Sequence, residues 1–175
     1  MVKLRNAEAH ELEALKNFLT THGANQWNYL PEDGIDEQFQ RLYKGIDHCL
    51  VAIDGGHPVG IAVYSKPGDI PTLFEPYVAE NPAVYVAEVT VHPEWGGQGI
   101  GSKLLNHIAA TSKASGANEL MIERHEQNIA SAGMMRKAGF AEIDCFLDLE
   151  RRETGSRKTS VLSRNLNTKR KVLKW

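Results

Sequence analysis

Four glycines lie within the six positions from Gly96 to Gly101, in the stretch VHPEWGGQGIGSKLL. The apolar, β-branched residues before them, VYVAEVTVHP, predict a strand that stops at Pro93. The residues after them repeat apolar side chains at helical spacing. A strand, a glycine-rich turn and a helix therefore follow one another without a linker, which indicates a compact domain of mixed secondary structure.

A glycine-rich turn at the start of a helix is typical of an anion site, because the first N–H groups of a helix have no partner within it. A tight turn alone needs one or two glycines, so four favour phosphate binding. The dinucleotide pattern GxGxxG fails, because Ser102 and Leu104 stand where its last glycine is required. The Walker pattern fails because Ser102-Lys103 reverses its order. The predicted phosphate-binding positions are Gly96, Gly97, Gln98, Gly99, Ile100, Gly101 and Ser102.

Length and composition are ordinary for one globular domain, with 175 residues, 42% hydrophobic and 24% charged. No apolar run approaches the roughly 20 residues that cross a bilayer. The first residues lack the apolar core of a secretory signal. Cys49 and Cys145 match no metal or redox spacing, so we expect reduced core thiols, no bound metal and a cytoplasmic location.

The net charge of -2 hides an asymmetry. Residues 151–175 contain nine Lys/Arg and one acid, which leaves 11 Lys/Arg and 21 Asp/Glu, a net charge of -10, in residues 1–150. A basic tail can contact nucleic acid, but a solvated terminus or a helix docked on an acidic body is the more common case. The acidic body fits a cationic substrate, although acidity can also serve solubility alone.

The remaining pattern predicts a mixed sheet with helices, in the order β-α-α-β-β-β-α-β-α-β-β. We expect a helix capped by Asn6 and ending near Gly23, and a second over 36–43 with Phe39, Leu42 and Tyr43 inward. The proline-rich segment 66–83 is a candidate substrate flap. The fold class is α+β or α/β. The other strands are expected at 2–7, 49–54, 58–65, 119–123, 141–150 and 158–166, and a last helix at 129–138.

The glycine stretch resembles the pyrophosphate-binding motif of the GNAT superfamily of N-acetyltransferases, Arg/Gln-x-x-Gly-x-Gly/Ala after Val-x-Pro. Val91 and Pro93 match the lead-in, and Gly99 and Gly101 match the two glycines. Gly96 departs from the pattern, because the family usually has Arg or Gln there. A second stretch, NIASAGMMRKAGF, is similar to the family's Asn-x-x-Ala/Ser and Gly-Phe pattern. Its matching positions are Asn128, Ser131, Gly139 and Phe140.

The resemblance spans about residues 2–165 and implies a single GNAT-type acetyltransferase domain over 1–165, with 166–175 as a basic tail. It implies a three-layer fold in which the fourth and fifth strands splay apart around acetyl-CoA, the cosubstrate. Val89, Thr90 and Val91 of the fourth strand would then pair with the pantetheine arm, beside Asn128 and Ser131. A backbone N–H near Val89 or Thr90 would meet the oxyanion. Dimers are common in the family, so a homodimer is one possible state.

The implied reaction moves an acetyl group to a primary amine of a small molecule or peptide. A lysine-like amine of pKa about 10.4 is mostly protonated at neutral pH, so a general base is useful. Glu123 is the first candidate, because its place five residues before Asn128 resembles that of a catalytic glutamate in one branch of the family. A salt bridge is the competing role. Glu88 is the second candidate, and it faces the substrate only if its strand bulges.

Met135 stands where the family usually has a tyrosine that acts as acid, and a thioether has no proton to donate. Tyr85 or water is the alternative donor. The departures at Met135 and Gly96 keep a second function open, a module that binds coenzyme A without turnover. Four loop aromatics either line the substrate pocket or cover the core: Trp27, Tyr29, Phe74 and Tyr77.

Overall fold

The structure is a computed structural model that describes residues 1–167. The basic tail expected over 166–175 lies outside the described residues except for Leu166 and Asn167. Leu166 is buried, and its N–H donates to the carbonyl of Asn118 at 2.9 Å. The folded domain therefore includes Leu166.

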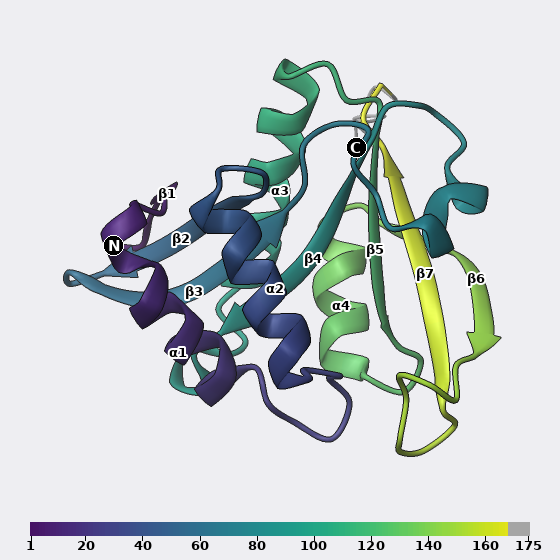
Figure 1. Cartoon of the computed structure of the whole chain (residues 1–175), viewed down its shortest axis with the longest axis horizontal. Helices are drawn as coiled ribbons and strands as arrows, with labels where there is room; N and C mark the ends of the chain where they lie inside the picture. Colours follow the sequence, from purple (N-terminus) through teal and green to yellow (C-terminus); the bar gives the residue numbers. More distant parts are fainter. Residues whose placement is uncertain (168–175) are drawn as a thin grey trace, which may run out of the picture.

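Seven strands form one mixed sheet in the order β1-β2-β3-β4-β5-β7-β6 (Figure 1). The strands are β1 Lys3–Asn6, β2 His48–Asp54, β3 His57–Tyr64, β4 Ala83–Val91, β5 Glu119–His125, β6 Ala141–Leu147 and β7 Lys158–Asn165. The helices are α1 Leu12–His22, α2 Glu32–Tyr43, α3 Ile100–Ala114 and α4 Ile129–Lys137, with short 3-10 turns η1 Ala9–Glu11, η2 Thr72–Tyr77 and η3 Pro93–Trp95. The predicted order of strands and α-helices is confirmed.

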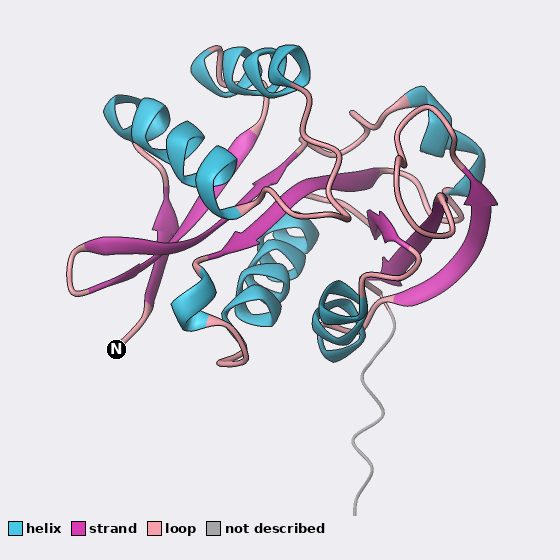
Figure 2. Ribbon diagram, turned by 90° about the horizontal axis from the view of Figure 1, so that it is seen from below, coloured by secondary structure: helices cyan, strands magenta, loops and turns pink. Residues whose placement is uncertain are grey.

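The four α-helices cover both faces of the sheet, α1 and α2 on one and α3 and α4 on the other (Figure 2). The apolar stripe of α3 packs on one face, where Leu104, Leu105 and Ile108 are fully buried. Leu15 and Leu19 of α1 pack on the opposite face together with Phe39 of α2. Each helix pair thus buries its stripe against the sheet, which gives the expected three-layer α+β fold.

The sheet is continuous at one end and open at the other. Strand β4 pairs in parallel with β5 over three residues only, the last pair being Tyr85 with Met121. Beyond that pair, residues 86–91 of β4 keep their partner β3, and β5 keeps its partner β7. The two strands therefore splay apart, as the family resemblance implied.

Three predicted helix details are wrong. Asn6 does not cap a helix, because it is the last residue of β1 and pairs with Leu50. The turn instead begins at Glu8, whose N–H donates to the Glu11 carboxylate at 2.8 Å. The second helix begins at Glu32, four residues before the predicted start, because Pro31 supplies an extended N-cap. Tyr43 is 48% exposed, and Ile35 takes the inward place that the pattern gave to Tyr43.

The proline-rich segment 66–83 is anchored at several points. Phe74 of η2 is buried and stacks on Tyr85, with ring centroids 5.3 Å apart. The buried Glu119 carboxylate accepts the N–H groups of Ala79 and Glu80, both at 2.9 Å. This segment therefore packs as part of the domain.

Cys145 was expected in the core but lies half-buried on β6, whereas Cys49 is buried.

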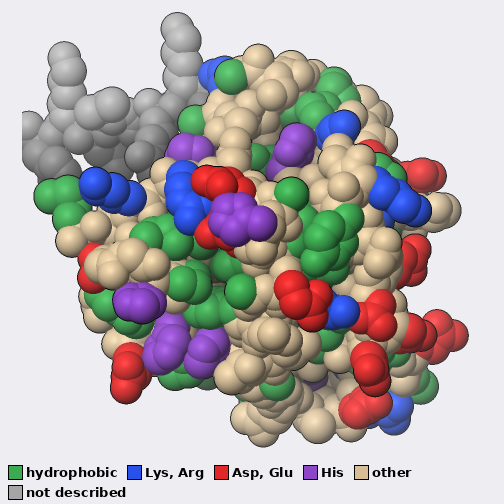
Figure 3. All heavy atoms as spheres, turned by 60° about the vertical axis from the view of Figure 1, so that its left-hand side comes forward, with side chains coloured by type: hydrophobic (Ala, Val, Ile, Leu, Met, Phe, Trp, Pro, Cys, Tyr) green, Lys and Arg blue, Asp and Glu red, His purple; other side chains and the backbone are tan. Residues whose placement is uncertain are grey.

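Acidic side chains gather on the right-hand side of the face drawn in Figure 3, the side on which α1 and α2 lie. The first two turns of α2 contain four acidic residues, Glu32, Asp33, Asp36 and Glu37. Part of the negative charge of residues 1–150 therefore lies on this side of the molecule. Within residues 1–167, no helix combines the length and apolarity that a membrane span needs.

Candidate active site

A cavity of about 360 Å³ passes through the gap between the splayed strands. Its walls are residues 86–91 of β4 and residues 122–124 of β5. One end reaches Asn128, Ser131 and the two methionines of α4, and the other reaches the segment between α1 and α2. The cavity therefore connects the two faces of the sheet.

The glycine-rich turn presents unpaired amides at one end of this gap. Gly97 and Gly99 adopt φ of 75° and 77°, a conformation that favours glycine. A Cβ at either position would meet no atom within 4 Å, so the space in front of them is open. Within residues 1–167, the N–H groups from 97 to 102 donate to no acceptor. Unpaired amides, a helix N-terminus and open space suit a phosphate group.

Gly101 has a different structural role from Gly97 and Gly99. A Cβ there would overlap Met134 Sδ of α4, so the missing side chain allows α3 and α4 to approach each other. The hydroxyl of Ser102 donates to the Met134 carbonyl at 3.1 Å and strengthens the same contact. The side chain of Ile100 is buried in the core, which leaves its backbone for a ligand. Gly96 and Gln98 complete the turn, and the cavity ends at Met134 beside it.

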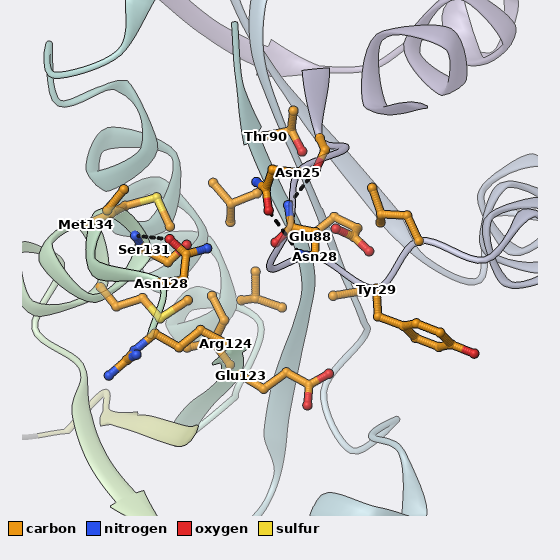
Figure 4. A pocket seen from close by; sticks show the side chains of 18 of the residues that line it. Asn25, Asn28, Tyr29, Glu88, Thr90, Glu123, Arg124, Asn128, Ser131 and Met134 are labelled. Atoms are coloured by element: carbon orange, nitrogen blue, oxygen red, sulfur yellow. Dashed lines mark hydrogen bonds between the residues drawn. The ribbon is translucent and has the colours of Figure 1, made fainter. Parts of the chain in front are cut away.

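Asn128 and Ser131 lie on the same side of the gap, at the start of α4 (Figure 4). Asn128 is the N-cap, and its Oδ1 accepts the Ser131 N–H at 3.2 Å. The amide nitrogen of Asn128 has no acceptor among the described residues, so it can donate to a ligand in the cavity. Val89 and Val91 line the same cavity and pack against the α3 core, whereas the side chain of Thr90 is buried on the opposite face, beside Gly23.

Glu88 occupies the middle of the gap because β4 bulges. Val63 pairs with Glu88 and Tyr64 pairs with Val86, which leaves Ala87 as the extra residue. The Glu88 side chain points into the cavity near Asn28 (Figure 4). It has no hydrogen-bond or ion-pair partner within residues 1–167. Burial, and then the negative charge of Glu123, raises the pKa of Glu88 to about 8, against the opposing effect of Arg152.

Glu123 also lines the cavity, but its carboxylate is already held. Arg151 donates to both of its oxygens, at 2.8 and 2.9 Å. The Tyr85 hydroxyl donates to Oε1 at 3.1 Å, and Arg152 Nη2 lies 4.0 Å from Oε2. Arg151 in turn contacts Asp148 at 2.7 Å. Glu123 is therefore the centre of an ion-pair network, with a partner that the sequence did not indicate.

Neither Met135 nor Tyr85 is well suited to act as a general acid. Met135 is buried in the α4 core and lines the cavity with a thioether. Tyr85 lines the cavity, but its proton is directed at Glu123, and burial followed by the charge of Glu123 raises the pKa of Tyr85 well above its usual value. A phenol in this state retains its proton, so it is a poor acid.

Of the four aromatics, only Tyr29 lines the cavity. Phe74 is core, the Trp27 ring packs on His125 with centroids 4.7 Å apart, and Tyr77 donates to Asp144 at 2.6 Å. Sequence reasoning missed the lining residues Gln38, Arg151 and Arg152. The two arginines were counted with the basic C-terminal residues, and no local pattern marks any of the three.

Within residues 1–167, no group of three His, Cys, Asp or Glu side chains is placed to hold a metal ion.

The splayed mixed sheet, with a glycine-rich turn at one end of the gap and Glu88 in its middle, is the arrangement that the family resemblance implied. The family model described as the acetyltransferase (GNAT) family matches residues 11–140, about three quarters of the chain. The protein belongs to this GNAT acetyltransferase family. Comparison with curated protein sequences finds none with a significant match.

Solved structures show the same fold at low sequence identity. An IAA acetyltransferase from Bacillus cereus is 19% identical with a TM-score of 0.70, covering 94% of this chain and 99% of its own. AAC(6')-Ib, solved in complex with Parmomycin and acetyl-CoA, is 15% identical with a TM-score of 0.70, covering 94% of this chain and 93% of its own. A ribosomal-protein-S18-alanine N-acetyltransferase from Escherichia coli is 14% identical with a TM-score of 0.66 and covers both chains fully. At these identities the likeness concerns the fold.

Proposed function

We propose that the protein transfers the acetyl group of acetyl-CoA to a primary amine of a small molecule or peptide, by direct attack in a ternary complex. The observation that carries this proposal is that one cavity, of about 360 Å³, joins the unpaired edge of β4, next to the glycine-rich turn, to the unpartnered carboxyl of Glu88.

The chain's residues fit coenzyme A. The free N–H groups from 97 to 102 suit its diphosphate, and the open Cβ positions at Gly97 and Gly99 let that group approach the backbone. The β4 edge from 86 to 91 has no strand partner on the β5 side, so Val89 and Val91 can pair with the amides of the pantetheine arm. We assign the Asn128 amide and Ser131 to the same arm.

When bound, acetyl-CoA supplies an acetyl group activated as a thioester, so that an N–C bond forms as the C–S bond breaks and its electron pair stays on sulfur. Glu88 accepts the proton that the amine loses, because its raised pKa of about 8 matches proton transfer near neutral pH. A β4 backbone N–H near Val89 or Thr90 donates to the acetyl oxygen as charge develops.

We place Glu123 second to Glu88 as the base. Both of its oxygens are engaged by Arg151, and its charge supports the raised pKa of Glu88. Since Met135 has no proton and Tyr85 retains its own, the thiol of coenzyme A leaves as the thiolate. A thiol pKa near 8.5 makes this step feasible without a protein acid.

The test is incubation with acetyl-CoA and a panel of primary amines, with released thiol measured by a thiol reagent and the acetylated product by mass. Thiol release that depends on both the amine and Glu88 is expected. The methionine at position 135 favours one alternative, a module that binds coenzyme A without turnover. Protection by acetyl-CoA against heat, with no thiol released from acetyl-CoA in the presence of any amine, would support that alternative and contradict the proposal.

A further inference from the structure

The cavity is walled off on the side of the β6–β7 connection. The Thr154 hydroxyl donates to the Gln26 carbonyl at 2.6 Å, and Arg152 Nη1 donates to the Trp27 carbonyl at 3.1 Å. The Trp27 ring packs on His125, whose Nε2 lies 2.8 Å from the Thr154 carbonyl. These contacts join segments 24–30 and 148–157 across the open end of the sheet. A substrate would have to break them to enter between the two segments.

A second cavity of about 270 Å³ adjoins the first on the other side of Glu88. It lies between α2 and the segment 66–71, and Gln38, Tyr85 and Ala87 line both cavities. Ala87 is the extra residue of the β4 bulge, directly before Glu88. The second cavity therefore begins one residue from the candidate base.

The helix wall of the second cavity is one face of α2. Its residues recur at the three- and four-residue spacing of a single helix face: Gly34, Glu37, Gln38 and Arg41. Gln38 has no hydrogen-bond partner within residues 1–167, and its side chain borders both cavities. An amide at that position can orient a molecule that extends from one cavity into the other.

The second cavity carries excess negative charge. Its lining contains three carboxylates, Glu37, Asp47 and Asp69, and one guanidinium, Arg41. Arg41 Nε contacts Asp47 at 2.8 Å and Arg41 Nη2 contacts Asp69 at 2.5 Å, so one cation is shared by two acids. Glu37 has no partner in the described part of the chain. A net charge of one minus three, or -2, favours a cationic occupant.

We propose that this second cavity holds the body of the acceptor, and that the acceptor is a primary amine carrying a second positively charged group, as a diamine does. The inference rests on the proposed acetyl transfer, because it places the reacting nitrogen at Glu88. The second charge then lies toward Glu37, while the contacts of segments 24–30 and 148–157 block the opposite approach.

The experiment compares three amines of equal chain length: butylamine, putrescine and γ-aminobutyrate. Putrescine should have a kcat/KM about tenfold above that of butylamine, which corresponds to one favourable charge contact, and γ-aminobutyrate should be the poorest. Equal kcat/KM values for the three amines would overturn the inference while leaving the proposed function intact.

Two glutamine variants on α2 locate the effect. Glu37→Gln should lower kcat/KM several-fold more for putrescine than for butylamine, so that the preference for putrescine shrinks. Glu32→Gln is the matched control, because Glu32 lies on the same helix with the same charge but outside the cavity lining. A putrescine preference that survives Glu37→Gln, or that Glu32→Gln reduces equally, would place the second charge elsewhere and contradict the inference.

Calorimetry of putrescine binding to the protein saturated with coenzyme A separates the two proposals. Putrescine binding that weakens in Glu37→Gln, without acetyl transfer to any amine, would refute the proposed function and uphold the binding site. No putrescine binding to the full-length protein would refute the site whatever the outcome for other amines.

Discussion

The two sides of the splayed gap offer a ligand different kinds of contact. On the α3 and α4 side, the candidate contacts are backbone amides exposed by glycine, such as Gly97 and Gly99. On the α1 and α2 side, the contacts are charged and polar side chains that come from distant parts of the chain, such as Glu88, Glu123 and Arg151. A site made of backbone depends on local conformation, whereas a site made of side chains depends on the assembled fold.

The largest expected effect is on the backbone side. Gly99→Val places a β-branched residue at a φ of 77° and puts carbon in front of the free amides, so affinity for coenzyme A should fall at least about 100-fold by calorimetry. Gly116→Val is the matched control, because Gly116 has a φ of 92° and open space at the far end of α3. Retained affinity in Gly99→Val would mean that the phosphates bind elsewhere.

On the side-chain side, Glu88→Gln should lower kcat about 100-fold or more, because the variant keeps the shape of the side chain and loses the proton acceptor. Affinity for coenzyme A should stay within about twofold, since Glu88 is on the acceptor side of the gap. Steady-state assays of thiol release measure kcat, and calorimetry measures the affinity for coenzyme A. A normal rate at neutral pH would remove Glu88 from the mechanism.

The same variant should change how stability depends on pH. The Glu88 carboxyl ionises near its ordinary value of 4.5 when unfolded and at about 8 when folded, so the folded state holds one more proton between these values. Stability from the protonated carboxyl is fully present below about 4.5 and is lost as the pH rises to about 8. Glu88→Gln lacks this loss and should gain on the order of a few kcal/mol over the natural protein by pH 8 to 9. If the free energy of urea unfolding changes with pH by the same amount in Glu88→Gln and in the natural protein, the assignment is contradicted.

Glu123→Gln distinguishes the two carboxylates by direction. Because the charge of Glu123 raises the pKa of Glu88, its removal should move the midpoint of the pH–rate profile to lower pH, with less than a tenfold loss of rate on the alkaline plateau. If Glu123 is the base, the rate should collapse and the optimum should move to higher pH. Glu126→Gln is the control, because Glu126 is a nearby acid outside the cavity lining.

The smallest expected effects concern Asn128, which serves both as a helix cap and as a candidate ligand contact. Asn128→Ala should cost about 1 kcal/mol of stability, because α4 loses its N-cap. Asn128→Asp keeps the cap and removes the amide donor. If both variants bind coenzyme A more weakly than the natural protein, the donor contacts it. If Asn128→Asp binds normally, Asn128 is structural only. Thermal unfolding and calorimetry give the two readings.

The fold was largely predictable because its signals are local. Apolar periodicity placed every strand and α-helix in order, and the turn chemistry of residues 55–57 placed the β2–β3 hairpin. The largest errors in the predicted secondary structure occur at helix ends. Asn6 suits a helix N-cap by its residue type, but it pairs with Leu50 in β1. Gly34 is a poor helix former within the first turn of α2, and the helix nevertheless begins directly after Pro31. Such choices depend on neighbouring strands, which a single sequence window does not contain.

The two halves of the site differ in the same way. The backbone half could be predicted, because Gly97 and Gly99 stand in one contiguous motif. The side-chain half could be predicted only in part: the sequence indicated Glu88 and Glu123, but not the residues that surround them. Arg151 meets Glu123 only because β7 pairs with β5, and Gln38 reaches the cavity from a helix 50 residues before Glu88. The orientation of the Glu88 side chain depends on a bulge at Ala87, and no glycine or proline near Ala87 indicates that bulge in the sequence.

The early end of β4–β5 pairing, at Tyr85 and Met121, has a consequence for the lifetime of the protein. A molecule bound in the gap between β4 and β5 contacts both parts of the sheet and binds only the folded chain. The concentration of that molecule therefore raises the folded fraction by mass action. Under this proposal, scarcity of acetyl-CoA would slow the reaction and also loosen the catalyst, leaving an idle enzyme more open to degradation than a working one.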